Sequence, residues 1–176
     1  LVYGRLHFIS DNPAEYDEEM WRLYLSQFPL KRTEILEADE THALFRAGLQ
    51  RYRLYHNLER KRREVEIPEG PYYGFGEGFF SGGVVQLEPY ESRLYLAVDS
   101  KPYAVAGSTG LALPGSEVEE FRFDEGRIDF RVSSGVMQEG SIFLRVPTFL
   151  EHCTVNGTLY PCEEKVDMNL VVVPRG

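Results

Sequence analysis

The sequence predicts a mainly β protein, in which antiparallel β-sandwich layers follow one strand–helix unit. Two observations support this prediction. Beyond Thr41, apolar residues alternate with polar ones, which is the period of a half-buried strand; Leu94 and Leu96 in segment 84–98 are an example. The predicted strands are also short and separated by turn residues, as is typical of a sandwich or barrel. Pro89 cannot donate a ladder hydrogen bond, so we expect it to separate two strands.

Composition limits the classes of partner. The chain has 176 residues, of which 43% are hydrophobic, enough to fill the core of one ordinary domain or two small ones. Its net charge of -9 argues against nucleic acid or an anionic membrane as a partner. The basic cluster at 60–63 is interpreted as a solvated turn. Because no segment has the roughly 20 apolar residues of a membrane span, and no leader opens the chain, we expect a cytoplasmic protein.

Residues 1–38 are predicted to form the strand–helix unit. The apolar run at 2–9 is typical of a buried strand, and Asn12 and Pro13 suit the N-cap and first position of a helix. Pro29 should end that helix. Large side chains at three- and four-residue spacings would give it an apolar stripe: Tyr16, Met20, Leu23 and Tyr24. A single unit of this kind cannot bury both faces of its strand.

The remaining residues are predicted to form two β segments, 39–98 and 99–176, the second being part of the same sandwich or a second small domain. The glycine-rich stretch 74–78 does not fit a dinucleotide-binding fingerprint, because it leads to another strand and not to a helix. We expect a loop or bulge there. Strands are expected at 42–46, 50–57, 64–67, 84–87, 94–98, 103–106, 117–123, 127–132, 141–146, 153–160 and 168–173.

The two cysteines are predicted to lie on one hairpin. Asn156-Gly157 favours a tight turn, which would place Cys153 opposite Tyr160 and Cys162 two residues further, on a diagonal. A diagonal pair is separated by about 7 to 8 Å, near the outer limit for a disulfide, so reduced thiols are favoured. The four histidines are scattered and none lies at ligand spacing from a cysteine. We therefore expect neither a metal site nor a cofactor.

Two parts of the chain resemble one enzyme family. The motif G-R-L-H-F-I-S-D-N-P at 4–13, with F-P-L-K-R at 28–32, resembles the end of the catalytic (β/α) barrel in glycoside hydrolases of the α-galactosidase and raffinose synthase clan. The segments R-Y-R-L-Y-H-N-L at 51–58 and L-E-P-Y-E-S-R-L at 87–94 are similar to the β-sandwich that follows this barrel. The resemblance covers roughly the first 98 residues. Since the chain opens with Leu1 inside the strand-like run, we expect it to be cut from a longer protein.

The resemblance implies that this chain is a non-catalytic C-terminal region of such an enzyme, which would act on α-galactosides. Both catalytic carboxylates of the family come from earlier barrel strands, so no catalytic residue is assigned here. Asp11 lies where a barrel residue would touch substrate, although it could instead help to cap the helix. The partner would be the catalytic barrel of the same or another chain.

Aromatic rings on a β scaffold suggest contact with carbohydrate. We assign Tyr72, Tyr73 and Phe75 as candidate substrate-binding residues, while noting that core packing is the commoner role of such rings. The alternative function is a free-standing β-sandwich module that binds carbohydrate or another protein. Exposure of Trp21 would favour the barrel unit, since an independent module would bury this ring itself.

Overall fold

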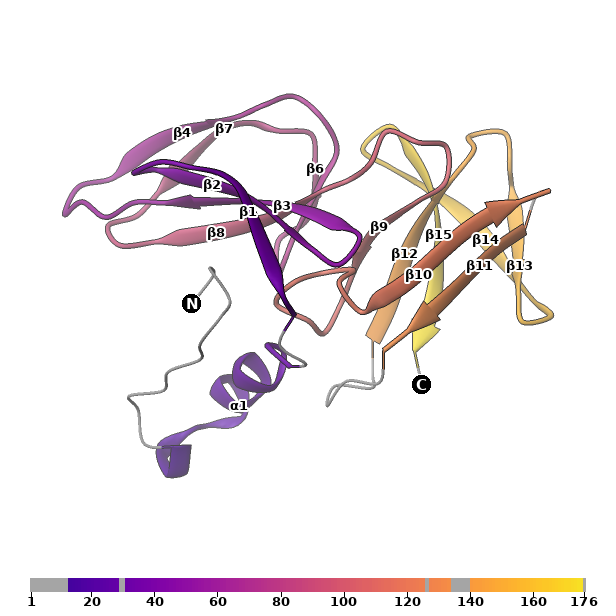
Figure 1. Ribbon diagram of the computed structural model, residues 1–176, viewed down its shortest axis with the longest axis horizontal. Helices are drawn as coiled ribbons and strands as arrows, with labels where there is room; N and C mark the ends of the chain where they lie inside the picture. The colour runs from indigo at the N-terminus through magenta and orange to yellow at the C-terminus, as the bar shows by residue number, and fades with distance from the viewer. Residues whose placement is uncertain (1–12, 29–30, 126, 134–139, 176) are drawn as a thin grey trace.

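The computed structural model describes residues 13–28, 31–125, 127–133 and 140–175. It is mainly β, and every strand pairing in these ranges is antiparallel, which confirms the predicted fold class at that level. Figure 1 shows two β units side by side, with helix α1 (Glu18–Leu25) below the first of them.

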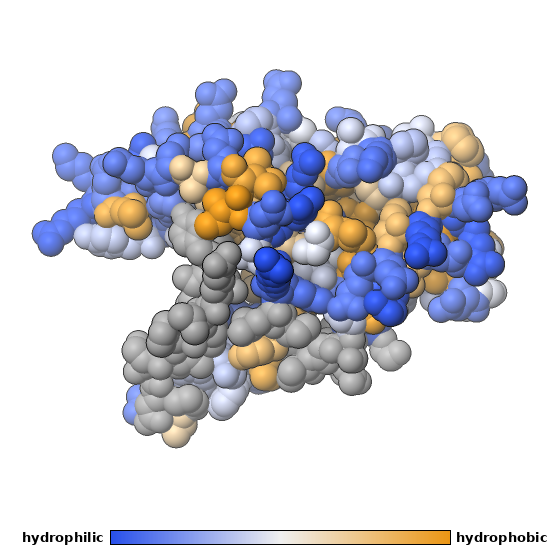
Figure 2. Space-filling view, viewed as in Figure 1, coloured by the Kyte–Doolittle hydropathy of each residue, from blue (hydrophilic) through white to orange (hydrophobic). Residues whose placement is uncertain are grey.

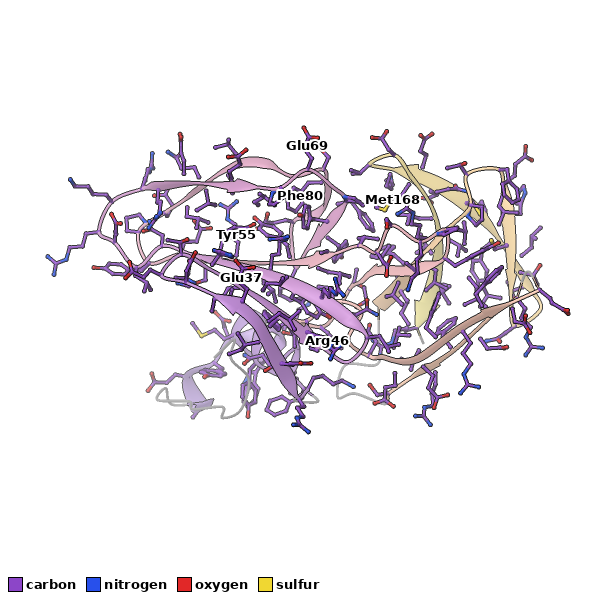
Figure 3. All side chains as sticks on the ribbon, turned by 45° about the horizontal axis from the view of Figure 1, so that its top comes forward. Glu37, Arg46, Tyr55, Glu69, Phe80 and Met168 are labelled. Carbon is purple, nitrogen blue, oxygen red and sulfur yellow. The ribbon has the colours of Figure 1, made fainter. Side chains whose placement is uncertain are left out.

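The first β unit is a six-stranded sheet with a two-stranded ribbon over part of one face. The sheet order is β1-β2-β3-β8-β5-β6, and the ribbon is β4-β7. Tyr55 and Phe80 lie in the apolar layer that joins the ribbon to the sheet (Figure 3). The strands are β1 (Thr33–Ala38), β2 (His42–Ala47), β3 (Gln50–His56), β4 (Arg63–Ile67), β5 (Tyr72–Gly74), β6 (Gly78–Phe80), β7 (Gly83–Leu87) and β8 (Ser92–Ala97).

The second β unit is a five-stranded sheet faced by a separate hairpin. The sheet order is β13-β14-β15-β12-β9, and the hairpin is β10-β11. Its core includes Ile142 and Val171 from the sheet, against which Ile128 and Phe130 of the hairpin pack. The strands are β9 (Ala104–Ser108), β10 (Val118–Asp124), β11 (Arg127–Val132), β12 (Gly140–Val146), β13 (His152–Val155), β14 (Thr158–Lys165) and β15 (Met168–Arg175).

The two β units share one apolar junction. The ring of Phe143 on β12 lies 5.4 Å from that of Tyr73 on β5 and 5.3 Å from that of Phe79 on β6, measured between centroids. Met168 and Leu170 of β15 belong to the same contact region. Burial therefore continues from one unit into the next, and the relative placement of the units is fixed by side-chain packing.

The predicted strands after residue 41 all have counterparts in the structure. Pro89 lies in the turn between β7 and β8, as expected. Asn156 and Gly157 have φ values of 49° and 83°, which is the conformation of a type I′ hairpin turn. This turn pairs Cys153 with Tyr160, as predicted. Within the stretch 74–78, residues 75–77 form the tight hairpin connection between β5 and β6.

The helix differs from its prediction. Its α-helical part begins at Glu18, and the side chain of Asp17 caps it by accepting a hydrogen bond from the backbone N–H of Met20 at 2.8 Å. Pro13–Glu15 instead forms a short 3-10 turn. The predicted start near Pro13 was wrong, because a second capping residue five positions after Asn12 competes for the same role. Asn12 itself lies outside the described residues.

Strand β1 was not predicted, and it lies inside the range 1–38 assigned to the strand–helix unit. Only Thr33 of its six residues is buried, so the strand lacks the alternating burial by which the others were recognised. It exists because it pairs with the edge of β2, with a register shift between Ile35 and Glu37. The first sheet consequently begins at Thr33. Figure 2 shows hydrophobic residues at the surface near β1, and others over the second β unit.

Candidate functional site

A pocket of about 590 Å³ lies where α1 meets the first β unit. We call it the helix pocket. Ala112 donates a backbone hydrogen bond to the carbonyl of Ser26 at 2.9 Å, which ties the end of the helix to the segment after β9. The pocket is thereby bounded by three segments that are distant in sequence. It is lined by Arg22, Ser26, Tyr73, Phe75, Gly76, Glu77, Gly78, Thr109 and Gly110.

Glu77 is the carboxylate of the helix pocket. One of its oxygens accepts a hydrogen bond from the hydroxyl of Tyr95 at 3.3 Å, and the other lies 3.7 Å from Nε of Arg93. Two fixed partners therefore orient a carboxylate whose side chain is still 42% exposed. The backbone N–H of Glu77 donates to the carbonyl of Gly74 at 3.1 Å, which fixes the turn that presents it.

The partners of Glu77 titrate far from neutral pH. Burial, and then the negative charge of Glu77, raise the pKa of Tyr95 to about 12, so its hydroxyl keeps the proton that it donates. A hydrogen bond to Glu91 raises the pKa of Arg93 still further above its usual value. Nε of Arg93 lies 2.7 Å from Oε1 of Glu91. The carboxylate of Glu77 consequently has a neutral donor and a permanent cation beside it at neutral pH.

The structure separates the three predicted sugar-binding rings. Phe75 is half-buried and lines the helix pocket. Tyr73 is buried and contributes to the pocket only as part of its wall. Tyr72 is buried on the other side of the sheet, against Phe80 at 5.4 Å, and does not line the pocket. Adjacent residues on a strand point to opposite faces, so one exposed patch of all three rings does not form.

Asp11, the fourth predicted site residue, lies outside the described residues. The prediction of Tyr72 as a sugar contact now requires its ring to leave the core, whereas Phe75 needs no such change.

Sequence reasoning missed Arg22 and Thr109, because they reach the pocket from the helix and from the end of β9. It also treated Glu77 only as part of a turn. The available signal was a charged residue between two glycines, in a stretch that also holds the aromatic residues Tyr72, Tyr73 and Phe75.

The chemistry of the helix pocket suits a polar, hydroxyl-rich ligand. It combines an aromatic face, an oriented carboxylate, a guanidinium and a hydroxyl, which together offer stacking and both donors and acceptors. Within the described ranges, no group of three or more His, Cys, Asp or Glu side chains is placed to hold a metal ion. No helix in the described part of the chain has the length and hydrophobicity needed to cross a membrane.

Comparisons of the chain with protein-family models, with curated proteins and with solved structures give no significant match.

Proposed function

We propose that this chain is a non-catalytic β-sandwich region of a glycoside hydrolase acting on α-galactosides, which packs on the catalytic barrel and contacts sugar through the helix pocket. The observation that supports this best is the exposure of two large apolar side chains on α1. Met20 is 52% exposed and Trp21 is 39% exposed, although both are large apolar residues on a short helix. A cluster of this kind favours a packing partner.

The aromatic side of α1 is continuous. Ring centroids lie 5.4 Å apart for Tyr16 and Trp21, 5.7 Å for Trp21 and Tyr24, and 5.2 Å for Tyr24 and Phe28. An eight-residue helix is too short to be stable by itself in water, so tertiary contacts must hold it. The bond from Ala112 to Ser26 anchors one end to the β units. A barrel, in the same or a partner chain, would cover Met20 and Trp21.

The helix pocket supports the sugar contact. Its position beside α1 would place it at the border between barrel and sandwich, where the sandwich would form one wall of the sugar site. The alternative function, a free-standing module that binds carbohydrate or another protein, uses the same pocket but needs no partner for α1. Protection of the α1 amides from hydrogen exchange by a packing partner therefore distinguishes the two functions.

Hydrogen exchange tests the barrel contact. We would compare amide exchange of Glu18–Leu25 in this chain with exchange in the longest natural polypeptide that contains it. We expect exchange to slow at least about tenfold in the longer polypeptide, because packing opposes local opening of the helix. Amides of Thr158–Lys165, remote from α1, are the internal control. Equal exchange of α1 in both polypeptides would favour the free-standing module.

Binding to an α-galactoside tests the pocket. Titration of the chain with raffinose, followed by nuclear magnetic resonance, should perturb residues of the helix pocket. Loss of the ring in Phe75→Ala should weaken binding about two- to tenfold, and Glu77→Ala about tenfold or more, since each removes one contact. Phe149→Ala is the matched control, because this ring is 78% exposed and belongs to the second β unit. Unchanged affinity in both pocket variants would contradict the proposed sugar site.

A further inference from the structure

The thiols of Cys153 and Cys162 meet beside a second cavity. This cavity has a volume of about 860 Å³ and lies between hairpin β10-β11 and the five-stranded sheet. Figure 1 shows the hairpin β10-β11 beside the strands of this sheet. Cys153 lines the cavity, together with Phe130 of the hairpin and Val171 of the sheet. Both cysteines are half-buried, so small molecules that enter the cavity can reach the thiol of Cys153.

The strand register explains the contact. Cys153 pairs with Tyr160, and Cys162 follows two residues later on the same face of β14. The backbone N–H of Cys162 donates to the carbonyl of Glu151 at 2.8 Å, so the ladder continues beyond the last paired residues. The two Sγ atoms lie 3.6 Å apart. The diagonal separation expected from the sequence is therefore bridged by side chains that point toward each other.

A disulfide requires only a small further approach. The bond length is about 2.05 Å, so the sulfurs must move together by roughly 1.5 Å. β13 is the edge strand of its sheet, held by β14 alone among the described strands. An edge strand with one neighbour can shift without breaking a second ladder.

We propose that Cys153 and Cys162 form a reversible disulfide by exchange with a small-molecule disulfide of the glutathione class. The thiolate of Cys153 attacks one sulfur of the oxidant, which forms a mixed disulfide and releases one glutathione thiolate. Cys162 then loses its proton and attacks the Cys153 sulfur, which forms the intramolecular bond and releases the second glutathione. The protein loses two electrons and two protons, and the oxidant becomes two thiols.

The environment assigns the order of these steps. Burial, followed by the contact with Cys153, raises the pKa of Cys162 to about 11, so this residue remains a thiol at neutral pH. Cys153 lines the cavity and meets the oxidant first. The disulfide between Cys153 and Cys162 would link β13 covalently to β14 along the cavity wall. This inference does not depend on the proposed sugar site or on the barrel contact.

Mass spectrometry of the native chain in glutathione redox buffers tests the proposal. As the oxidised fraction rises, we expect both thiols to disappear together and the intact mass to fall by two hydrogens, with full reversal by dithiothreitol. Closing this short loop should also raise the Tm by roughly 5 °C, since it restricts the unfolded chain. Independent glutathione adducts on both cysteines, or two thiols that persist until the protein is denatured, would overturn it.

Single variants test the order of attack. Cys162→Ser should stop after the first step and keep one glutathione on Cys153. Cys153→Ser should acquire the adduct at least about tenfold more slowly, because burial, the largest cause of the raised pKa of Cys162, remains in this variant and keeps that thiol protonated. Equal adduct formation by the two variants would overturn the assignment of Cys153 as the attacking residue.

Discussion

Glu117, which directly precedes β10, is a buried carboxylate. Its side chain is 1% exposed, and Oε1 accepts a hydrogen bond from Nη1 of Arg175 at 3.2 Å. Oε2 is buried and has no hydrogen-bond partner within the described residues. Burial raises the pKa of Glu117, and the interaction with the Ser108 side chain and the nearby cation of Arg175 oppose this shift only in part. The folded protein therefore favours the protonated form of this residue more than the unfolded chain does.

The raised pKa of Glu117 makes the free energy of unfolding depend on pH in a definite direction. Between the unfolded pKa near 4.5 and the raised folded value, the folded state binds more protons, so the free energy of unfolding falls as pH rises through this window. Arg175→Met removes the cation, so the free energy of unfolding should decrease more strongly as pH rises. We expect a loss of about 3 to 5 kcal/mol at pH 8 and a smaller loss at pH 5, measured by urea denaturation.

Two variants control for effects other than the buried charge. Arg131→Met removes an arginine that is 63% exposed and pairs with Glu120 at the surface, so it should cost about 1 kcal/mol or less. In the Arg175→Met background, Glu117→Gln should restore most of the stability lost at high pH, because it removes the unpaired charge. A loss in Arg175→Met that is the same at pH 5 and pH 8 would show that packing, and not ionisation, is responsible.

At the scale of elements, prediction from sequence succeeded where one face of a strand is buried. β2, for example, alternates half-buried His42 with buried Ala43 and half-buried Leu44 with buried Phe45, a burial pattern that matches its sequence period. Strand β1 was not predicted, because an edge strand is specified by its neighbour more than by its own side chains. The predicted start of α1 was wrong because Asn12 and Asp17 are both good capping residues, and local sequence does not decide between them.

The candidate site could be predicted only in part, for a related reason. Phe75 was assigned because an aromatic ring on a β scaffold suggests contact with sugar, and it lines the helix pocket. Arg22 and Thr109 have no such local signal, since they reach the helix pocket only after α1 docks on the segment following β9. Sequence periodicity also cannot say which of two adjacent tyrosines faces a core, and Tyr72 and Tyr73 proved to be buried on opposite sides of the sheet.

Gly107 on β9 shows how tightly the elements are fitted. A Cβ added there would lie 2.7 Å from the ring of Tyr73, closer than any normal contact. We expect Gly107→Ala to destabilise the protein by about 1 to 3 kcal/mol in urea denaturation, because the ring must shift from its packing against Phe79 and Phe143 to make room. Tyr73→Leu removes the clashing ring, so adding Gly107→Ala to it should cost much less. Additive losses in this double-mutant cycle would contradict direct contact as the cause.

At the scale of the whole molecule, the two β units behave as one body because their cores meet. A segment after β9 passes between them: the hydroxyl of Tyr52 on β3 donates to the carbonyl of Pro114 at 2.9 Å, and Val118 at the segment's end belongs to the core of the second unit. Together with Phe143 and its aromatic neighbours, this segment supplies contacts that neither unit has alone. We therefore expect both units to unfold in a single cooperative transition.

Truncation of Phe143 is the sharpest test of this coupling. The ring contacts Tyr73 and Phe79 across the junction, whereas its strand neighbours Ile142 and Leu144 point into the core of the second unit. Phe143→Ala should therefore cost about 2 to 4 kcal/mol and, by removing contacts between the units, split the calorimetric transition into two. Ile142→Val removes volume inside the second unit only, so it should lower the Tm while leaving one transition. If Phe143→Ala still unfolds in one step, the segment between the units is sufficient to couple them.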